Sequence, residues 1–229
     1  MRKRNQPLRD WYYFTDVTPG TGPCVGSDGM PDAATYESWF GFDSLPKLQA
    51  HNPDVRALIW DSADSIVKKW VDVGVDGWRF DVGGDVDPGV TNDPTNDYWE
   101  GFRAAYPGTY MVIEEWGNAS PWLLGHEMDA TMNYQYSSAM LSFWRDTTFT
   151  DNDHNSGSSA GELTPLTPSQ LDARLHNWQE RYPAEAYYAM MNLLDSHDTN
   201  RALFMLDENA ATGTDATPLL DPNYDWSDA

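Results

Sequence analysis

The sequence predicts an α/β fold with a parallel sheet, and three observations support this prediction. Four short apolar segments are typical of buried strands, at 77–82, 110–115, 128–134 and 189–195. Helical patterns lie between them, which is the order of a parallel α/β sheet. Three of the four segments end in acidic residues or histidine. Because active sites of parallel sheets form at the carboxyl ends of the strands, we expect a site at that edge.

The first predicted helix precedes the first strand. Residues 1–52 are rich in Gly, Pro and Asp and are predicted to be mostly loop. Asn52 is a helix cap, with Pro53 and Asp54 in the first turn. One apolar stripe then continues at steps of three and four residues as far as Gly74, which predicts a single amphipathic helix.

The rest of the chain alternates in the same way. We expect a loop at 83–89, a short helix at 98–105, a helical segment at 137–147 and a capped helix from Thr167 to about 182. The polar segment 151–159 is interpreted as a mobile linker, with a Ca²⁺ site as the alternative. Three regions follow: a loop-rich segment at 1–52, the α/β domain at 53–206 and a tail at 207–229.

Composition limits the classes of partner. A net charge of −22 and a pI near 4.2 argue against nucleic acid and anionic membranes, since like charges repel. Cys24 is the single cysteine, so an intrachain disulfide and a cysteine-based metal site are excluded. The basic start of residues 1–7 has no apolar core after it and is not a signal peptide. The compartment stays undetermined, and secretion is an open alternative.

The first strand carries two charged residues on one face. Side chains alternate along a strand, so Arg79 and Asp81 share a side opposite Trp78 and Phe80. A neighbouring arginine favours the ionised form of a carboxylate, as a nucleophile requires. A structural ion pair at the strand end is the alternative for this segment alone.

Two further strand ends supply candidate groups. Alternation along the second strand favours Glu114 as the inward carboxyl group, with Glu115 as a surface or supporting acid. His197 and Asp198 follow the fourth strand and could bind vicinal sugar hydroxyls. One ionised and one protonated carboxyl group, about 5 Å apart, are what a retaining glycosidase needs.

These segments resemble the ordered signature regions of the α-amylase superfamily, glycoside hydrolase family 13. The matching stretches are GWRFDV at 77–82, VIEEW at 112–116 and NLLDSHDTNR at 192–201. Residues 42–49, FDSLPKLQ, together with 119–125 and 132–134, resemble the neopullulanase, cyclomaltodextrinase and amylopullulanase branch. Gln49 replaces the usual asparagine of that branch, and Ile113 stands where a glycine usually precedes the glutamate.

The resemblance implies a (β/α)8 TIM barrel, of which the chain would hold roughly strands 4 to 7 as an internal fragment. It implies a glycoside hydrolase that acts on starch, pullulan or maltodextrins at α-1,4 bonds, with α-1,6 bonds as an open alternative, through a covalent glycosyl-enzyme intermediate. Asp81 would be the nucleophile, Glu114 the acid/base and Asp198 the transition-state stabiliser. Arg79, His197, Trp116 and Arg201 would bind substrate. No cofactor is required, and Ca²⁺ is an open alternative.

Two other functions remain open from the sequence. The chain could be a carbohydrate-binding remnant without catalysis, using aromatic residues such as Trp39, Phe40, Trp116 and Trp122. It could also transfer the glycosyl group to a sugar hydroxyl in place of water. A sheet with two open edges also favours self-association.

Overall fold

The computed structural model describes residues 8–13, 36–39, 42, 44–86, 98–150, 163–207 and 222–225. The chain divides into two compact units. One contains Met1–Gly77 and Val82–Thr109, and the other contains Trp78–Asp81 and Tyr110–Ala229. All the residues predicted to form the site belong to the second unit.

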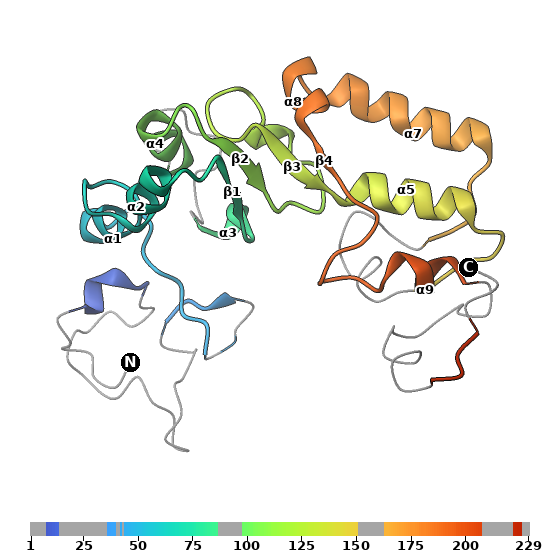
Figure 1. Ribbon diagram of the computed structural model, residues 1–229, viewed down its shortest axis with the longest axis horizontal. Coiled ribbons are helices and arrows are strands. Elements are labelled where there is room, and N and C mark those ends of the chain that lie inside the picture. The colour runs from blue at the N-terminus through green and yellow to red at the C-terminus, as the bar shows by residue number, and fades with distance from the viewer. Residues whose placement is uncertain are drawn as a thin grey trace. The chain divides into compact units, whose positions relative to one another are not determined.

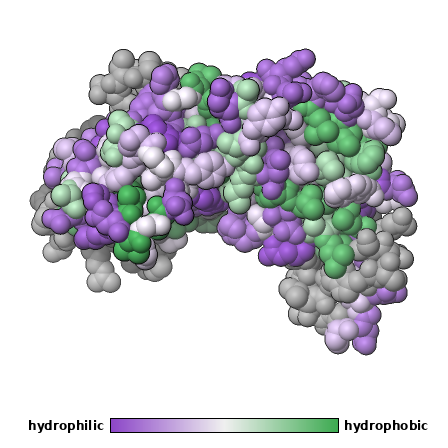
Figure 2. Space-filling model, turned by 45° about the horizontal axis from the view of Figure 1, so that its top comes forward, coloured by the Kyte–Doolittle hydropathy of each residue, from purple (hydrophilic) through white to green (hydrophobic). Residues whose placement is uncertain are grey.

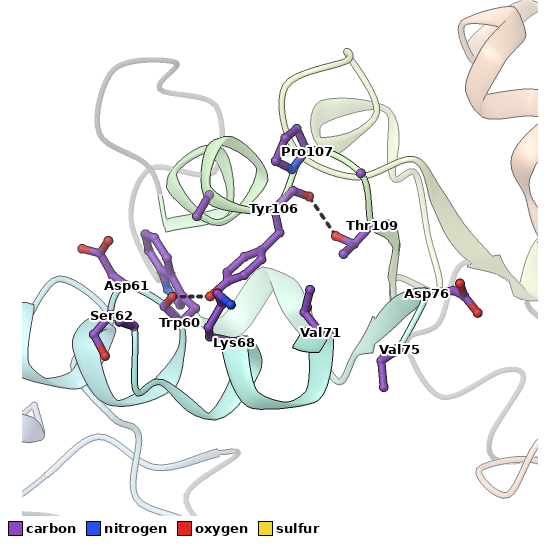
Figure 3. A pocket seen from close by; sticks show the side chains of 13 residues that line it. Trp60, Asp61, Ser62, Lys68, Val71, Val75, Asp76, Tyr106, Pro107 and Thr109 are labelled. Carbon is purple, nitrogen blue, oxygen red and sulfur yellow. Dashed lines mark hydrogen bonds between the residues drawn. The ribbon is translucent and has the colours of Figure 1, made fainter. Parts of the chain in front are cut away.

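The first unit is helical. Its longer helices are α1 (Pro53–Ile59), α2 (Ile66–Val73) and α4 (Tyr98–Ala105), with short α3 (Gly83–Val86) and a 3-10 turn at Arg9–Trp11. A buried aromatic cluster joins α4 to the end of α1, where Trp60, Tyr98 and Phe102 pack at ring distances of 5.6–5.9 Å. Figure 3 shows Tyr106 beside Trp60, and the Tyr106 hydroxyl donates to the Trp60 carbonyl at 2.7 Å.

The single helix predicted between Asn52 and Gly74 is wrong. The Asn52 cap is present, since its side chain accepts from the amides of Asp54 and Val55. The helix ends at Ile59, however, and α2 starts anew after Ser65, whose hydroxyl accepts from the Lys68 amide. A second cap thus interrupts the apolar stripe.

The second unit contains the parallel sheet. Its strands are β1 (Gly77–Phe80), β2 (Tyr110–Ile113), β3 (Ala130–Asn133) and β4 (Met191–Asn192), in the order β1-β2-β3-β4. β2 pairs in parallel with β3, and β3 pairs in parallel with β4. The predicted α/β class with a parallel sheet is therefore confirmed, and the strands lie side by side in Figure 1.

The remaining helices of this unit are α5 (Tyr134–Trp144), α7 (Pro168–Arg181), α8 (Ala184–Ala189) and α9 (Ala202–Leu206). A 3-10 turn spans Ser120–Trp122. α5 and α7 lie side by side in Figure 1. One core cluster packs Leu141 of α5 against Phe149, Leu163 and Phe204, and another surrounds Tyr134 next to Val112, Ala130 and Met132.

Two further predictions differ from the structure. The segment predicted as a loop at 83–89 includes α3. The strand predicted at 189–195 to be buried is only two residues long, and both are exposed. β4 is an edge strand of the described sheet, so no further strand of that sheet pairs with its outer side.

The segment 151–159, considered for Ca²⁺, lies outside the described residues, as does Phe40.

The surface carries a mixture of polar and apolar residues. On the face shown in Figure 2, hydrophilic and hydrophobic residues are interspersed. Several large apolar side chains of α1 and α2 are exposed, among them Leu58, Ile66 and Trp70, although the sequence pattern predicted that they would pack. Val55 and Val67 are the residues of these two helices that are buried. In the described part of the chain, no helix is long and apolar enough to span a membrane.

Candidate active site

The predicted site residues come from three strand ends. Asp81 directly follows β1, on which Arg79 lies, and Glu114 directly follows β2. The segment after β4 carries His197 and Asp198. Because these strands belong to one sheet, their carboxyl ends bring the side chains to the same edge.

Arg79 connects two of the carboxyl groups. Its guanidinium forms an ion pair with Asp81 through Nη1 and another with Glu114 through Nη2, the latter at 2.9 Å. The third nitrogen, Nε, donates to the Met132 sulfur at 3.1 Å. All three nitrogens are thus engaged, and the guanidinium is fixed between β1, β2 and β3. The pairing of Arg79 with Asp81, two residues apart on one strand face, is the pairing predicted from the sequence.

Asp81 is held in its ionised form. Burial raises the pKa of this carboxyl. Hydrogen bonds with Glu114 and Arg79 and the positive charges of Arg79 and His197 lower the pKa, and together they outweigh the effect of burial. The net pKa of Asp81 lies below its ordinary value of 3.8. The side chain is 74% exposed, so it remains open to a reacting molecule. These are the properties of a carboxylate nucleophile.

Glu114 lies in a different environment, because its side chain is only 7% exposed. Met111 and Ile113 are fully buried on the opposite face of β2, and the Glu114 amide donates to the Phe80 carbonyl at 2.9 Å. Alternation from Ile113 then directs Glu114 toward Arg79. The adjacent Glu115 instead accepts from the Gly117 amide at 2.9 Å, which closes a local turn.

Trp116 contacts both Glu114 and Tyr134. Its indole nitrogen donates to Glu114 Oε1 at 3.1 Å. Its ring stacks on Tyr134 with centroids 3.7 Å apart and planes 6° from parallel. One face of the indole is therefore covered by protein, and its N–H orients the glutamate. Substrate binding by Trp116, expected from the sequence, stays a prediction, whereas the structure shows that its indole N–H positions Glu114.

Tyr134 extends these contacts to the segment after β4. Its hydroxyl is hydrogen-bonded to the Ser196 hydroxyl at 2.9 Å, and the Asp198 amide donates to Ser196 at 3.0 Å. Burial raises the pKa of Tyr134, and the negative charges of Glu114 and Asp198 add to this in spite of the Ser196 hydrogen bond. The phenol therefore stays neutral near neutral pH and can donate a hydrogen bond.

His197 and Asp198 form a pair on the exposed side of the site. His197 Nε2 lies 3.2 Å from Asp198 Oδ2, and their side chains are 73% and 40% exposed. Arg201 donates to the Ser196 carbonyl, and this hydrogen bond stabilises the segment that carries His197 and Asp198. Asp195 accepts from the Ala202 amide at 2.6 Å, which ties the segment to the start of α9. Both polar side chains of the pair therefore face outward from a segment with several internal supports.

Three contacting residues received no individual role in the sequence analysis: Tyr134, Ser196 and Met132. Met132 and Tyr134 lie in the stretch 132–134, which resembles the neopullulanase, cyclomaltodextrinase and amylopullulanase branch. Ser196 directly precedes His197. Proximity to the recognised motifs is therefore the signal that could have indicated them. In the described residues, no three His, Cys, Asp or Glu side chains gather as a metal ion would require.

The sequence of this chain is similar to those of known proteins. The sequence model of the α-amylase catalytic domain matches residues 1–221. An amylopullulanase of Thermoanaerobacter thermohydrosulfuricus is 35% identical over 223 residues, which cover 90% of this chain and 13% of the relative. Neopullulanase 2 of Thermoactinomyces vulgaris is 31% identical, over 89% of this chain and 29% of the relative.

Solved structures show the same fold. A protein of Thermus thermophilus matches with a TM-score of 0.68 and 31% identity, over 92% of this chain and 44% of that one. The chain thus spans less than half of these related chains, and its four-stranded sheet is part of a TIM barrel. The family and these named relatives are glycoside hydrolases. From the match over residues 1–221, the chain belongs to the α-amylase catalytic-domain family.

Proposed function

We propose that this chain supplies catalytic residues for the retaining hydrolysis of α-glucosidic bonds in α-glucans. Asp81 attacks the anomeric carbon as the nucleophile, and Glu114 protonates the leaving oxygen and then activates water. The observation that carries this proposal is the contact of one guanidinium, that of Arg79, with both carboxyl groups.

The closeness of the two carboxyl groups supports retention of configuration. Inverting glycosidases keep their carboxyl groups about 6.5–9.5 Å apart so that a water molecule fits between substrate and base. One guanidinium group, that of Arg79, contacts both Asp81 and Glu114, which keeps the two carboxyl groups close together. The pair therefore fits an enzyme with a covalent glycosyl intermediate.

The supporting residues have separate roles in this proposal. His197 and Asp198 bind sugar hydroxyls, and Asp198 stabilises the ring as positive charge develops. Trp116 holds Glu114 and contacts a sugar ring. Arg201 positions the segment of His197 and Asp198 through the Ser196 carbonyl. We propose no cofactor, and a structural Ca²⁺ elsewhere in the chain stays a separate hypothesis.

The exposure of Asp81 bears on the acceptor. With 74% of this side chain exposed, water has access to the carbon to which the carboxylate bonds. We therefore favour hydrolysis over transfer to a second sugar. The substrates we propose are starch, pullulan or maltodextrins, and amylopullulanase and neopullulanase among the relatives carry the pullulan substrate in their names.

The same exposure favours a second candidate, carbohydrate binding without turnover. Catalysis by electrostatic stabilisation depends on the exclusion of water from the site, whereas the exposed Asp81 side chain remains in contact with water. In this case the 229-residue chain binds maltooligosaccharides but does not cleave them. A binding titration with maltoheptaose, combined with an assay of reducing-sugar release, separates the two functions.

The proposal is tested by release of reducing sugar from soluble starch and pullulan. We expect Asp81→Asn and Glu114→Gln to lower turnover by about four orders of magnitude, since each removes a reacting group. Glu115→Gln is the matched control, because this neighbour caps a turn and should retain most activity. Near-normal turnover in Asp81→Asn would refute the proposed nucleophile.

A further inference from the structure

A hollow lies between α5 and α7 of the second unit and shares no residue with the candidate active site. It has a volume of about 670 Å³. Its polar lining comes from the segment after β2 and from both helices, namely Asn118, Gln135, Ser138, Arg174, Asn177 and Arg181. None of the described residues that line it is acidic. This is unusual in a chain with 36 acidic and 14 basic residues.

The lining follows one stripe of α7. Arg174, Asn177, Trp178 and Arg181 are spaced as i, i+3, i+4 and i+7, so they share one side of the helix. A stripe with this spacing is normally apolar where a helix packs on its neighbour. Here only Trp178 is apolar, and it is buried at 7% exposure. Asn177 and Arg181 are exposed, as polar residues on a helix surface usually are, whereas Arg174 is half-buried.

Arg181 has a structural explanation. It donates to Gln135 of α5 at 3.1 Å and to Asn177 at 2.8 Å, and thereby joins the two helices. It also lies in the last turn of α7, where a cation is favourable. Its position therefore does not by itself indicate a ligand.

Arg174 has no such explanation. It is half-buried, and among the described residues it has no hydrogen-bond or ion-pair partner. A guanidinium that loses part of its hydration without a partner is unfavourable, unless a ligand supplies the missing acceptors. By contrast, Arg79 and Lys68 both form ion pairs with carboxylates.

The two asparagines present donors to the same hollow. The Asn118 oxygen accepts from the Ser120 amide at 3.1 Å, and the Asn177 oxygen accepts from Arg181. Their amide nitrogens have no partner among the described residues, so each is available as a donor. Together with Arg174, they suit a ligand that only accepts hydrogen bonds. A neutral sugar hydroxyl both donates and accepts, and fits less well.

We propose that this hollow binds a phosphate group, either as free inorganic phosphate or as the ester of a sugar phosphate. The donors come from two separate segments of chain, the one after β2 and α7, and the tetrahedral oxygens of phosphate can accept from several directions at once. Arginine is well suited to phosphate because its planar fork of N–H groups matches the oxygens. This binding goes beyond glucan hydrolysis and does not depend on it.

The test is calorimetric titration of the 229-residue chain with inorganic phosphate at low ionic strength. We expect Arg174→Gln to weaken binding about tenfold or more, since it removes charge-assisted hydrogen bonds. Lys69→Gln is the matched control, because it removes one exposed positive charge from α2 and should leave affinity unchanged. Equal affinity in Arg174→Gln and the original chain would overturn the proposal, as would absence of binding up to about 20 mM phosphate.

A second variant and a second ligand complete the test. Asn177→Asp places a carboxylate in the hollow and should abolish phosphate binding by repulsion, with the fold checked by circular dichroism. Tighter binding of glucose 6-phosphate than of inorganic phosphate would assign the site to a sugar ester, and equal binding would assign it to the free anion. Displacement of phosphate by neutral glucose would overturn the anion site. Each result is independent of whether the chain cleaves starch.

Discussion

At Arg79, one side chain contacts both carboxyl groups and lowers the pKa of one of them, Asp81. The hydrogen bond and the positive charge of Arg79 lower the pKa of Asp81 against the opposing effect of burial. The ionised form therefore persists to a pH below the ordinary carboxyl value. Any favourable effect of this ionised group on folding is fully present above the ordinary value and is lost as the pH falls through the lower, folded value.

Replacing Arg79 with methionine should raise the pKa of Asp81, since the contribution of burial then has less to oppose it. The measurement is a pH titration of the Asp81 carboxyl carbon by NMR, which needs no catalytic turnover. In an active enzyme, the acidic limb of the pH profile should move to higher pH by the same cause. Lys69→Met serves as the control for loss of an exposed positive charge on α2, outside the candidate site, and an identical titration in both variants would contradict the expectation.

At Tyr134, the expected effect concerns stability. Tyr134→Phe keeps the ring stacked on Trp116 but removes the hydrogen bond to Ser196. We expect the free energy of unfolding to fall by about 1 kcal/mol, as measured by urea denaturation. Tyr136→Phe is the matched control, because no hydrogen bond of the Tyr136 hydroxyl is seen among the described residues, and its effect should be smaller.

At the scale of elements, the packing of α4 depends on a residue without a side chain. A Cβ at Gly101 would lie 2.8 Å from Cη2 of Trp60, whose ring is buried. Gly101→Ala should therefore destabilise the helical unit by about 1–3 kcal/mol through overpacking, despite the better helix propensity of alanine. Gly108→Ala meets nothing within 4 Å and should change stability by less than about 0.5 kcal/mol. Thermal unfolding of the two variants compares them directly, and equal midpoints would disprove the close contact.

Local signals predicted helix starts better than they predicted helix continuity. The Thr167 cap is present with its reciprocal partner Gln170, and the helix ends at Arg181, as expected. These interactions involve neighbouring residues, so the sequence contains them in full. The interruption at Ser65 and the exposure of β4 depend on what surrounds each segment, which periodicity does not encode.

The same distinction applies to the site. The pairing of Arg79 with Asp81 and the inward direction of Glu114 follow from strand alternation, a rule with a period of two residues. The contact of Tyr134 with Ser196 joins residues 62 positions apart, and the sulfur of Met132 meets Arg79 across 53 positions. Such contacts arise only when the strands are assembled in order. The catalytic roles of these residues remain predictions.

At the scale of the whole molecule, the charge of −22 should oppose folding. Screening shortens the range of repulsion from about 30 Å at 0.01 M salt to about 3 Å at 1 M. We therefore expect the thermal midpoint to rise with sodium chloride at pH 7. Near the pI of 4.2 this increase should vanish, because net repulsion has gone. A midpoint that falls with salt at pH 7 would show that attractive pairs dominate.

The stacked pair of Trp116 and Tyr134 also has an entropic consequence for recognition. An indole fixed at 3.7 Å against a buried phenol, and tied through its nitrogen to Glu114, has already lost its rotational freedom in the unliganded chain. Ordering a flexible side chain on binding typically costs about 0.5–1.5 kcal/mol. A sugar ring that stacks on this pair would contact a side chain that is already immobile. The free-energy cost of ordering the Trp116 side chain is therefore part of folding and does not reduce the affinity for the sugar.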